Sequence, residues 1–284
     1  METLKIIECP RDAMQGMKEF VPTELKTEYI NLLLKCGFDT IDFGSFVSPK
    51  AIPQMRDTAE VLKGLYLNGK SKLLAIVANE RGADDALQFS EIDYLGYPFS
   101  VSEVFQMRNT NSTIEESLGR VENIQNLVAA KNKKLVVYLS MGFGNPYDEI
   151  WNSELVLNWS RILHKNLGVE ILALSDTIGI AKEADVSDLF KVLKTELSQV
   201  EFGAHFHTRP ETTDKLIKAA YDSGCRRFDG AIKGFGGCPM AKDDLTGNLP
   251  TEALLAWLDS HLINNPIDKK LFRDAYDFSA SIFL

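Results

Sequence analysis

Two histidines separated by one residue, His205 and His207 in the segment "GAHFHTRP", have the clearest potential for chemistry. In a β-strand, residues i and i+2 point to the same side, so both imidazoles would face one direction. Such a pair can ligate a metal ion, or it can be two polar residues that are hydrogen-bonded at the end of a sheet. The pair alone leaves both interpretations open.

Further polar side chains stand at the ends of other apolar, β-branched stretches. They are, in chain order, Arg11, Asp12, Gln15, Asp42, Ser45, Asn79, Ser140, Asp176 and Thr177. Each has an ordinary structural explanation when taken singly, such as Asp12 capping a turn. Taken together, Asp12, the histidine pair and a nearby amide oxygen would form a mixed nitrogen and oxygen site for a divalent metal ion.

The elements that must position these residues are eight expected β-strands that alternate with amphipathic helices. The strands are expected at 4–8, 39–44, 72–78, 92–97, 134–140, 169–175, 200–207 and 226–232. Helices are expected at 23–37, 111–132, 153–168, 184–198 and 251–262, the first with Thr23 as its cap and Gly37 as its stop.

This alternation favours parallel strands closed into a (β/α)8 TIM barrel, whose C-terminal strand ends meet at one mouth. A doubly wound open sheet is the alternative, but it usually has fewer strands and a glycine-rich first turn, which this sequence lacks. The length of 284 residues fits one domain, 1–284, with the barrel at about 4–263 and an extra C-terminal helical segment at 264–284.

The composition argues against several classes of function. A formal net charge of -9 disfavours nucleic-acid binding, and no apolar stretch is long enough to cross a membrane. The cysteines show neither CxxC nor zinc-ribbon spacing, and the opening residues lack a signal-peptide pattern. We therefore expect reduced thiols in a cytoplasmic protein.

The glycine-rich segment "GFGGCPMAKDDLTGN", residues 234–248, follows the last expected strand and carries Cys238. A long flexible segment over a polar mouth is typical of an active-site lid, so we interpret Cys238 as a thiol exposed to the mouth. A tight turn with an incidental cysteine is the alternative. Cys36 and Cys225 are expected in the core, and Cys9 could be either.

Four segments resemble 3-hydroxy-3-methylglutaryl-CoA lyase, a TIM-barrel metallolyase family within a wider group that includes isopropylmalate and homocitrate synthases. They are "IDFGSFVSPKAIPQMRDTAEVLKGL", "RNTNSTIEES", "SDTIGIA" and "GFGGCPMAKDDLTGNLPTE". The similarity covers nearly the whole chain. The sequence departs from the family pattern at Thr208, which replaces an acidic residue, and at Asp42, which replaces a glutamate. The interval from Cys238 to Asn248 is also one residue longer.

The resemblance implies a divalent cation, Mg²⁺ or Mn²⁺, bound by Asp12, His205, His207 and Asn248. It also implies that Cys238 is the catalytic cysteine of the loop. The residues expected to contact the substrate are Gln15, Ser45, Ser140, Asp176, Thr177 and Glu252. The partner would be a small-molecule acyl-CoA, and the family leads us to expect a homodimer.

The reaction of that family is a retro-Claisen cleavage of 3-hydroxy-3-methylglutaryl-CoA to acetyl-CoA and acetoacetate. Arg11 would stabilise the enolate oxygen, and Cys238 would supply a proton to the enolate carbon. His205 is the first candidate for the base that accepts the hydroxyl proton, with Asp42 in support.

Two other classes stay open at this stage. A condensing synthase of the same superfamily would join acetyl-CoA to a 2-oxo acid, but such enzymes often carry a further C-terminal domain. A non-catalytic barrel that binds acyl-CoA is the other, and the intact set of Arg11, Asp12, His205, His207 and Cys238 argues against it.

Overall fold

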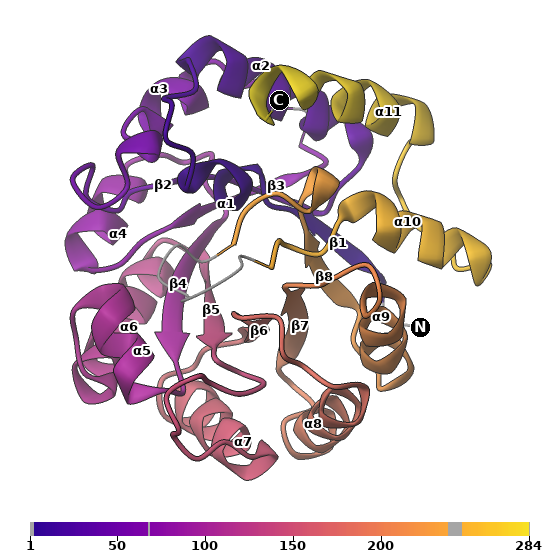
Figure 1. Ribbon diagram of the computed structural model, residues 1–284. Coiled ribbons are helices and arrows are strands. Elements are labelled where there is room, and N and C mark those ends of the chain that lie inside the picture. The colour runs from indigo at the N-terminus through magenta and orange to yellow at the C-terminus, as the bar shows by residue number, and fades with distance from the viewer. Residues whose placement is uncertain (1–2, 68, 238–245, 284) are drawn as a thin grey trace.

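Eight short parallel strands close into a barrel in the computed structural model, which describes residues 3–67, 69–237 and 246–283 (Figure 1). Each strand pairs with its neighbours in chain order, and β8 closes the barrel on β1. The strands are β1 (Lys5–Glu8), β2 (Thr40–Ser45), β3 (Lys72–Ile76), β4 (Tyr94–Ser100), β5 (Lys134–Ser140), β6 (Ile171–Asp176), β7 (Glu201–Phe206) and β8 (Arg227–Gly230). The predicted TIM barrel is confirmed.

The observed strands differ from the expected ranges mainly at their ends. β3 stops at Ile76, two residues early, because the chain is already turning into helix α4 (Glu80–Ala86). The side-chain oxygen of Asn79 accepts the backbone N–H of Gly82 at 2.9 Å and so caps this helix. Of the two explanations open for Asn79, the ordinary structural one therefore holds, since the side chain serves as an N-cap.

Helices surround the barrel and include all five expected from the sequence. They are α1 (Pro10–Gln15), α2 (Thr23–Cys36), α3 (Thr58–Lys63), α4, α5 (Glu103–Thr110), α6 (Ile114–Ala130), α7 (Ser153–Arg161), α8 (Glu183–Glu196), α9 (Thr213–Asp222), α10 (Thr251–Ser260), α11 (Lys269–Phe278) and α12 (Ala280–Phe283). Gly37 ends α2 with φ 97°, as predicted. The expected Thr23 cap is wrong, because Pro22 precedes the helix and the Thr23 hydroxyl donates to Asp57 at 2.8 Å.

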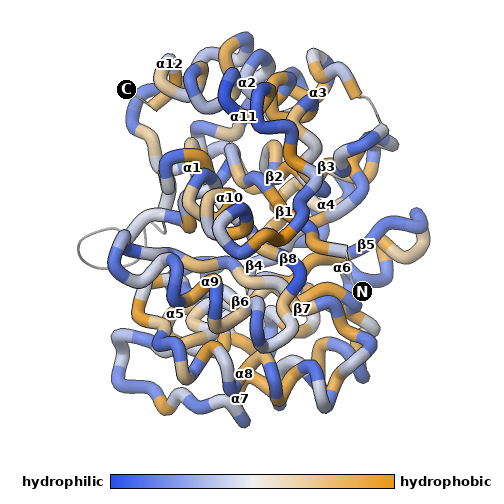
Figure 2. The backbone as a smooth tube through the Cα atoms, turned by 90° about the vertical axis from the view of Figure 1, so that its right-hand side faces the viewer, coloured by the Kyte–Doolittle hydropathy of each residue, from blue (hydrophilic) through white to orange (hydrophobic). Residues whose placement is uncertain are grey.

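The interior of the barrel is apolar along β3 to β6 and polar along β7, β8 and β2. The apolar cluster consists of Leu74, Ile76, Tyr94, Val136, Tyr138, Ile171 and Ala173. The other strands contribute the buried or largely buried charged and ionisable side chains Asp42, His205, Arg227 and Asp229. Figure 2 shows hydrophobic stretches in the strands and an alternation of hydrophilic and hydrophobic residues along the helices around them. The polar half of the interior is thus where chemistry can occur.

The predicted C-terminal segment forms two helices, α11 and α12, that pack beside α2 (Figure 1). The ring of Tyr29 in α2 stacks on Phe278 at a centroid distance of 6.3 Å and meets Phe283 edge-on at 6.1 Å. The N–H of Asp268 also donates to the carbonyl of Cys36 at 2.8 Å. The segment therefore packs against the outside of the barrel wall and reaches the loop after β8, where Phe283 stacks on Phe235 at a centroid distance of 4.5 Å.

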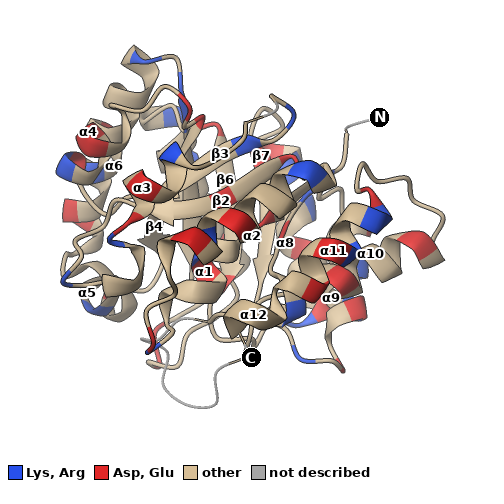
Figure 3. Cartoon of the chain, turned by 90° about the horizontal axis from the view of Figure 1, so that it is seen from above, with Lys and Arg blue, Asp and Glu red and all other residues tan. Residues whose placement is uncertain are grey.

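The charged residues lie mainly on the outer helices, where acidic and basic side chains are mixed (Figure 3). Acidic residues are prominent on α2 and α11 in that view. This distribution is consistent with the net charge of -9 and gives no extended basic face in the view shown. Within the described part of the chain, no helix has the length and apolar character needed to span a membrane.

Candidate metal centre at the barrel mouth

Helix α1 brings two charged side chains and an amide to the mouth of the barrel. It starts just after β1 with Pro10 at a first-turn position, where the missing N–H has no cost. Nη1 of Arg11 donates to Asp12 Oδ1 and to Gln15 Oε1, both at 2.9 Å. Nε2 of Gln15 also donates to Asp12 Oδ1 at 2.7 Å. The three predicted residues therefore form one hydrogen-bonded group.

Arg11 also binds Asp42, whose side chain projects from β2. Nε donates to the two carboxylate oxygens at 3.2 and 3.0 Å, and Nη2 donates to Oδ2. Burial raises the pKa of Asp42 to about 6, although the adjacent guanidinium lowers it. The Nε hydrogen, both Nη1 hydrogens and one Nη2 hydrogen are engaged in this way. Within the described residues, the second Nη2 hydrogen of Arg11 is left for a ligand.

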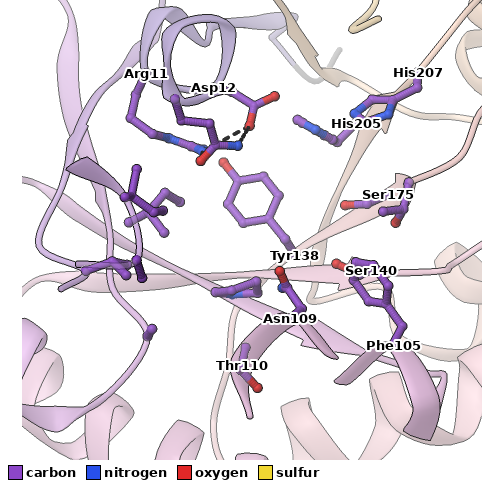
Figure 4. Close-up of a pocket in the computed structure, with 18 residues that line it drawn as sticks. Arg11, Asp12, Phe105, Asn109, Thr110, Tyr138, Ser140, Ser175, His205 and His207 are labelled. Carbon is purple, nitrogen blue, oxygen red and sulfur yellow. Dashed lines mark hydrogen bonds and ion pairs between the residues drawn. The ribbon is translucent and has the colours of Figure 1, made fainter. Parts of the chain in front are cut away.

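The histidine pair at the end of β7 lies near Asp12 (Figure 4). The ring centroids of His205 and His207 are 5.7 Å apart. One ligand atom from each of Asp12, His205 and His207 lies within 4.8 Å of the other two. The side chains of His205 and Asp12 are 12% and 10% exposed, so the group is shielded yet reachable from the mouth. The structure thus brings these three residues together.

The pKa values of this group follow from its burial and its charges. Burial lowers the pKa of His205, but the hydrogen bond to Asp229 and the charges of Asp229 and Asp12 outweigh it, and the net shift is upward. Burial and the neighbouring His205 lower the pKa of His207 to about 4. Burial would raise the pKa of Asp12, but Arg11 and the two imidazoles outweigh it and lower the value. His207 is therefore neutral near pH 7, the form that ligates metals.

Asn248 joins the group from the segment that follows β8. Its backbone pairs with His207 in an isolated antiparallel bridge. Its Nδ2 donates to Asp12 Oδ2 at 2.6 Å and to the carbonyl of Phe235 at 2.9 Å. The structure therefore places the fourth expected ligand beside Asp12, with the NH₂ of its amide turned to the carboxylate.

A cavity of about 240 Å³ opens beside this group (Figure 4). The predicted site residues that line it are Arg11, Asp12, Gln15, Ser140, Thr177, His205 and His207. Its apolar lining includes Val47, Ile52, Ile76, Ala78 and Pro98. A molecule in the cavity would thus meet charged groups on one side and hydrocarbon on the other.

Other predicted substrate-binding residues lie outside this cavity and have other partners. The carboxylate of Asp176 accepts two backbone N–H groups of the loop after β6, both at 3.0 Å, and burial raises its pKa to about 6. The hydroxyl of Ser45 donates to a carbonyl of β3 at 3.3 Å. Glu252 accepts the backbone N–H of Lys233 at 3.0 Å. In this structure these three side chains, like Asp42, shape the surroundings of the cavity.

Sequence reasoning missed several residues of the site. Asn109 and Thr110, at the end of α5, line the cavity. Tyr138 also lines it and meets His205 edge-on at a centroid distance of 5.5 Å. Asp229 in β8 lies 3.3 Å from His205. Tyr138 and Asp229 could have been found as polar residues inside otherwise apolar strands, a pattern that the search for strand ends passed over.

The cysteines bear out part of the sequence interpretation. Cys36 and Cys225 are completely buried core thiols, as predicted. Cys9 is buried as well, and its Sγ lies within 4.8 Å of ligand atoms of His205 and Asp229. Cys238 falls outside the described residues, so its expected place over the mouth stays a prediction.

Comparisons with known proteins give a consistent result. A family model described as HMGL-like matches residues 4–278. The cytoplasmic 3-hydroxy-3-methylglutaryl-CoA lyase of Rattus norvegicus is 32% identical over 280 residues, which is 98% of this chain and 80% of that protein. A hydroxymethylglutaryl-CoA lyase of Bacillus subtilis is 34% identical over 250 residues, 88% of this chain and 83% of that protein.

Solved structures show the same relationship. The HMG-CoA lyase of Bacillus subtilis superposes with a TM-score of 0.92 at 31% identity, covering 100% of this chain and 94% of that one. An HMG-CoA lyase of Acinetobacter baumannii, solved in complex with coenzyme A and 3-methylmalate, has a TM-score of 0.91 at 29% identity, covering 99% and 91% of the two chains.

The fold and the site together define a TIM barrel with a candidate metal centre at the C-terminal ends of its strands. The comparisons are more specific. Because the family model matches nearly the whole chain, the chain belongs to the HMGL-like family of acyl-CoA lyases, as the resemblance in sequence implied.

Proposed function

We propose that the chain is a divalent-metal-dependent lyase that cleaves 3-hydroxy-3-methylglutaryl-CoA to acetyl-CoA and acetoacetate. The observation that carries the proposal is the group of Asp12, His205 and His207, whose ligand atoms lie within 4.8 Å of one another beside the cavity. The relatives named above are lyases for this substrate, which supports the choice of acyl group.

The donor set fits Mg²⁺ or Mn²⁺. One carboxylate and two imidazoles leave coordination positions for substrate oxygens, and Mn²⁺ in particular accepts such a mixed set. Asn248 would be the fourth ligand through Oδ1, which requires its amide to turn, since Nδ2 now donates to Asp12. The cation would act as a Lewis acid that lowers the pKa of the tertiary hydroxyl of the substrate.

The side chains of the protein supply the other steps. His205 is our first candidate for the base that takes the hydroxyl proton, and Asp42 supports it. As the C–C bond breaks, its electron pair moves onto the acetyl-CoA fragment as an enolate, and the unpaired Nη2 hydrogen of Arg11 stabilises the enolate oxygen. Cys238 then donates a proton to the enolate carbon, which completes acetyl-CoA.

Substrate contacts follow from the lining of the cavity. Gln15, Ser140 and Thr177 would bind polar groups of the acyl chain, and the apolar wall near Ile76 would face the methyl group. Asp176, Ser45 and Glu252 would contribute indirectly, because their hydrogen bonds to the backbone fix the segments that surround the substrate. Coenzyme A as the carrier is supported by the Acinetobacter baumannii relative, which was solved with it. We also propose a homodimer and a cytoplasmic location.

The test is to offer 3-hydroxy-3-methylglutaryl-CoA with Mg²⁺ or Mn²⁺ and to measure acetoacetate. We expect turnover with the metal and none in a chelated sample. A metal-loaded protein that forms no acetoacetate would contradict the proposal. Consumption of acetyl-CoA with a 2-oxo acid would identify a synthase instead, and acyl-CoA binding without turnover would identify a non-catalytic barrel.

A further inference from the structure

A buried carboxylate lies behind the histidine of the metal group. Asp229 in β8 is 1% exposed, and its Oδ2 lies 3.3 Å from Nδ1 of His205. The two residues are register partners of the adjacent strands β7 and β8. Because paired residues of neighbouring strands point to the same side of the sheet, the register of the barrel itself creates this contact.

A buried cation flanks the same carboxylate. Arg227 is 1% exposed, and its Nε lies 3.9 Å from Asp229 Oδ1. Gly203 in β7 makes room for it, since a Cβ at that position would lie 2.9 Å from Cδ of Arg227. Asp229 thus has a cation on one side and an imidazole on the other.

The contribution of this ion pair to folding does not explain why Asp229 is there. Removing each ion from water costs several kcal/mol, and apolar residues of similar volume often serve stability equally well. The pairing is also imperfect, because Asp229 Oδ1 and Arg227 Nε and Nη2 have no hydrogen-bond partner within the described residues. The contact with His205 is the feature that requires a carboxylate at this position.

We propose that Asp229 is a positioning residue of the metal centre, which accepts the Nδ1 hydrogen of His205 and leaves Nε2 bare to face Asp12 and His207. A neutral imidazole carries one hydrogen, so the partner of one nitrogen decides which nitrogen can ligate. Tyr138 meets the His205 ring edge-on at 5.5 Å and restricts its rotation. This inference rests on the proposed function, because it concerns the cation that the function requires.

The arrangement also narrows what His205 can do in the reaction. Nδ1 carries the hydrogen that is donated to Asp229, so this nitrogen cannot take the hydroxyl proton of the substrate. Only Nε2 remains, and it is the nitrogen that the proposal assigns to the cation. At any one moment His205 can therefore either ligate the cation or take the hydroxyl proton through Nε2, so the two roles proposed for it compete.

The first experiment measures Mn²⁺ binding by calorimetry to the wild type, Asp229→Asn and a control, Asp57→Asn. The amide introduced by Asp229→Asn can donate to Nδ1 and so move the hydrogen of His205 to Nε2, which removes the ligand lone pair. We expect this variant to bind Mn²⁺ about 10- to 100-fold more weakly, the usual loss when such a partner is removed. Asp57 is a matched control, because it is also buried in an ion pair, with Lys26 at 2.7 Å, outside the metal group. Its variant should bind Mn²⁺ like the wild type.

The second experiment reads the tautomer of His205 in the metal-free wild type by ¹H–¹⁵N correlation spectra at alkaline pH. The chain has four histidines, so His164→Gln and His261→Gln leave only the pair to assign. We expect the Nδ1–H form, and an Nε2–H form would overturn the inference even if Asp229→Asn does not fold. Equal Mn²⁺ affinity of Asp229→Asn and wild type would also overturn it and leave the proposed function intact. A wild type that binds neither Mn²⁺ nor Mg²⁺ would contradict both.

Discussion

Glu8, the last residue of β1, is a completely buried carboxyl group whose ionisation should control stability. Burial raises its pKa to about 8, although two hydrogen bonds oppose the shift. Thr251 Oγ1 donates to Oε2 at 2.5 Å, and the N–H of Ile232 donates to Oε1 at 2.8 Å. These partners lie on either side of the segment that carries Asn248, so Glu8 ties both ends of that segment to the barrel.

The sign of the effect follows from proton binding. In the unfolded chain the carboxyl has its ordinary pKa of 4.5, so between that value and about 8 the folded chain holds a proton that the unfolded chain has released. The free energy of unfolding therefore falls as the pH rises through this window. Each pH unit contributes at most about 1.4 kcal/mol, so Glu8 should lower the free energy of unfolding by on the order of 4 kcal/mol between about pH 5 and about pH 8.

Glu8→Gln should remove this decline. Glutamine keeps an acceptor for the Ile232 N–H, and its NH₂ stands where the protonated acid has its O–H. In both cases the Thr251 hydroxyl turns to accept that hydrogen, so glutamine reproduces the protonated acid. We expect the variant and the wild type to unfold at similar urea concentrations near pH 5 and to diverge as the pH rises, with the variant more stable. Denaturant titrations across the pH range measure the difference in the free energy of unfolding between the variant and the wild type. The contributions of Asp42 and Asp176 cancel in this difference, because both proteins contain these residues. Glu115→Gln, at an exposed position of α6, is the control. Parallel curves for Glu8→Gln and wild type would refute the reasoning.

Three further predictions concern the reaction. Chelation should abolish turnover, and Mg²⁺ or Mn²⁺ should restore it. His207→Ala should weaken Mn²⁺ binding by about 10- to 100-fold or more. Full activity in a metal-free sample would contradict this prediction. Arg11→Lys should lower kcat by about 10²- to 10³-fold, because an ammonium cannot bind Asp42, Asp12 and Gln15 and still face the enolate; a kcat within a few-fold of wild type would assign Arg11 to structure. Cys238→Ala should bind Mn²⁺ normally and turn over about 10²- to 10⁴-fold more slowly than the wild type. In the wild type, bound substrate should protect the Cys238 thiol from alkylation. A wild type that is active and resists alkylation would exclude this thiol from the mechanism.

The fold could be predicted from the sequence because its main signals are periodic. Apolar strand runs and amphipathic helices recur along the whole chain, and their alternation allows few arrangements other than a barrel. Prediction failed at positions where two partners or two elements compete for the same residue. Thr23 did not become the cap of α2, because its hydroxyl is used by Asp57 and Pro22 already fixes the start of the helix. β3 ends earlier than expected, because Asn79 caps the helix that follows, α4.

The site was predicted only where its residues stand at strand ends. Arg11, Asp12, His205 and His207 were found in this way, since the barrel brings such ends to one mouth. Asp229 was missed because it lies inside a strand, and its contact with His205 depends on the register of β7 and β8. Register is a property of the closed barrel, so no local sequence pattern contains it.

The division of the barrel interior explains how one site can hold several charges and still favour the charge that the proposed reaction develops. Arg11, Asp12 and Asp42 neutralise one another through direct contacts, and His207 is neutral, so burying the group leaves few charges unpaired. The apolar wall of β3 to β6 lowers the local dielectric, which strengthens the effect of each remaining donor on the charge that develops in the transition state. The Nη2 hydrogen of Arg11 that has no partner among the described residues is such a donor. If the wall of β3 to β6 were polar, its own dipoles would also stabilise the enolate and screen the charge of Arg11. The Nη2 hydrogen of Arg11 would then contribute less to the rate.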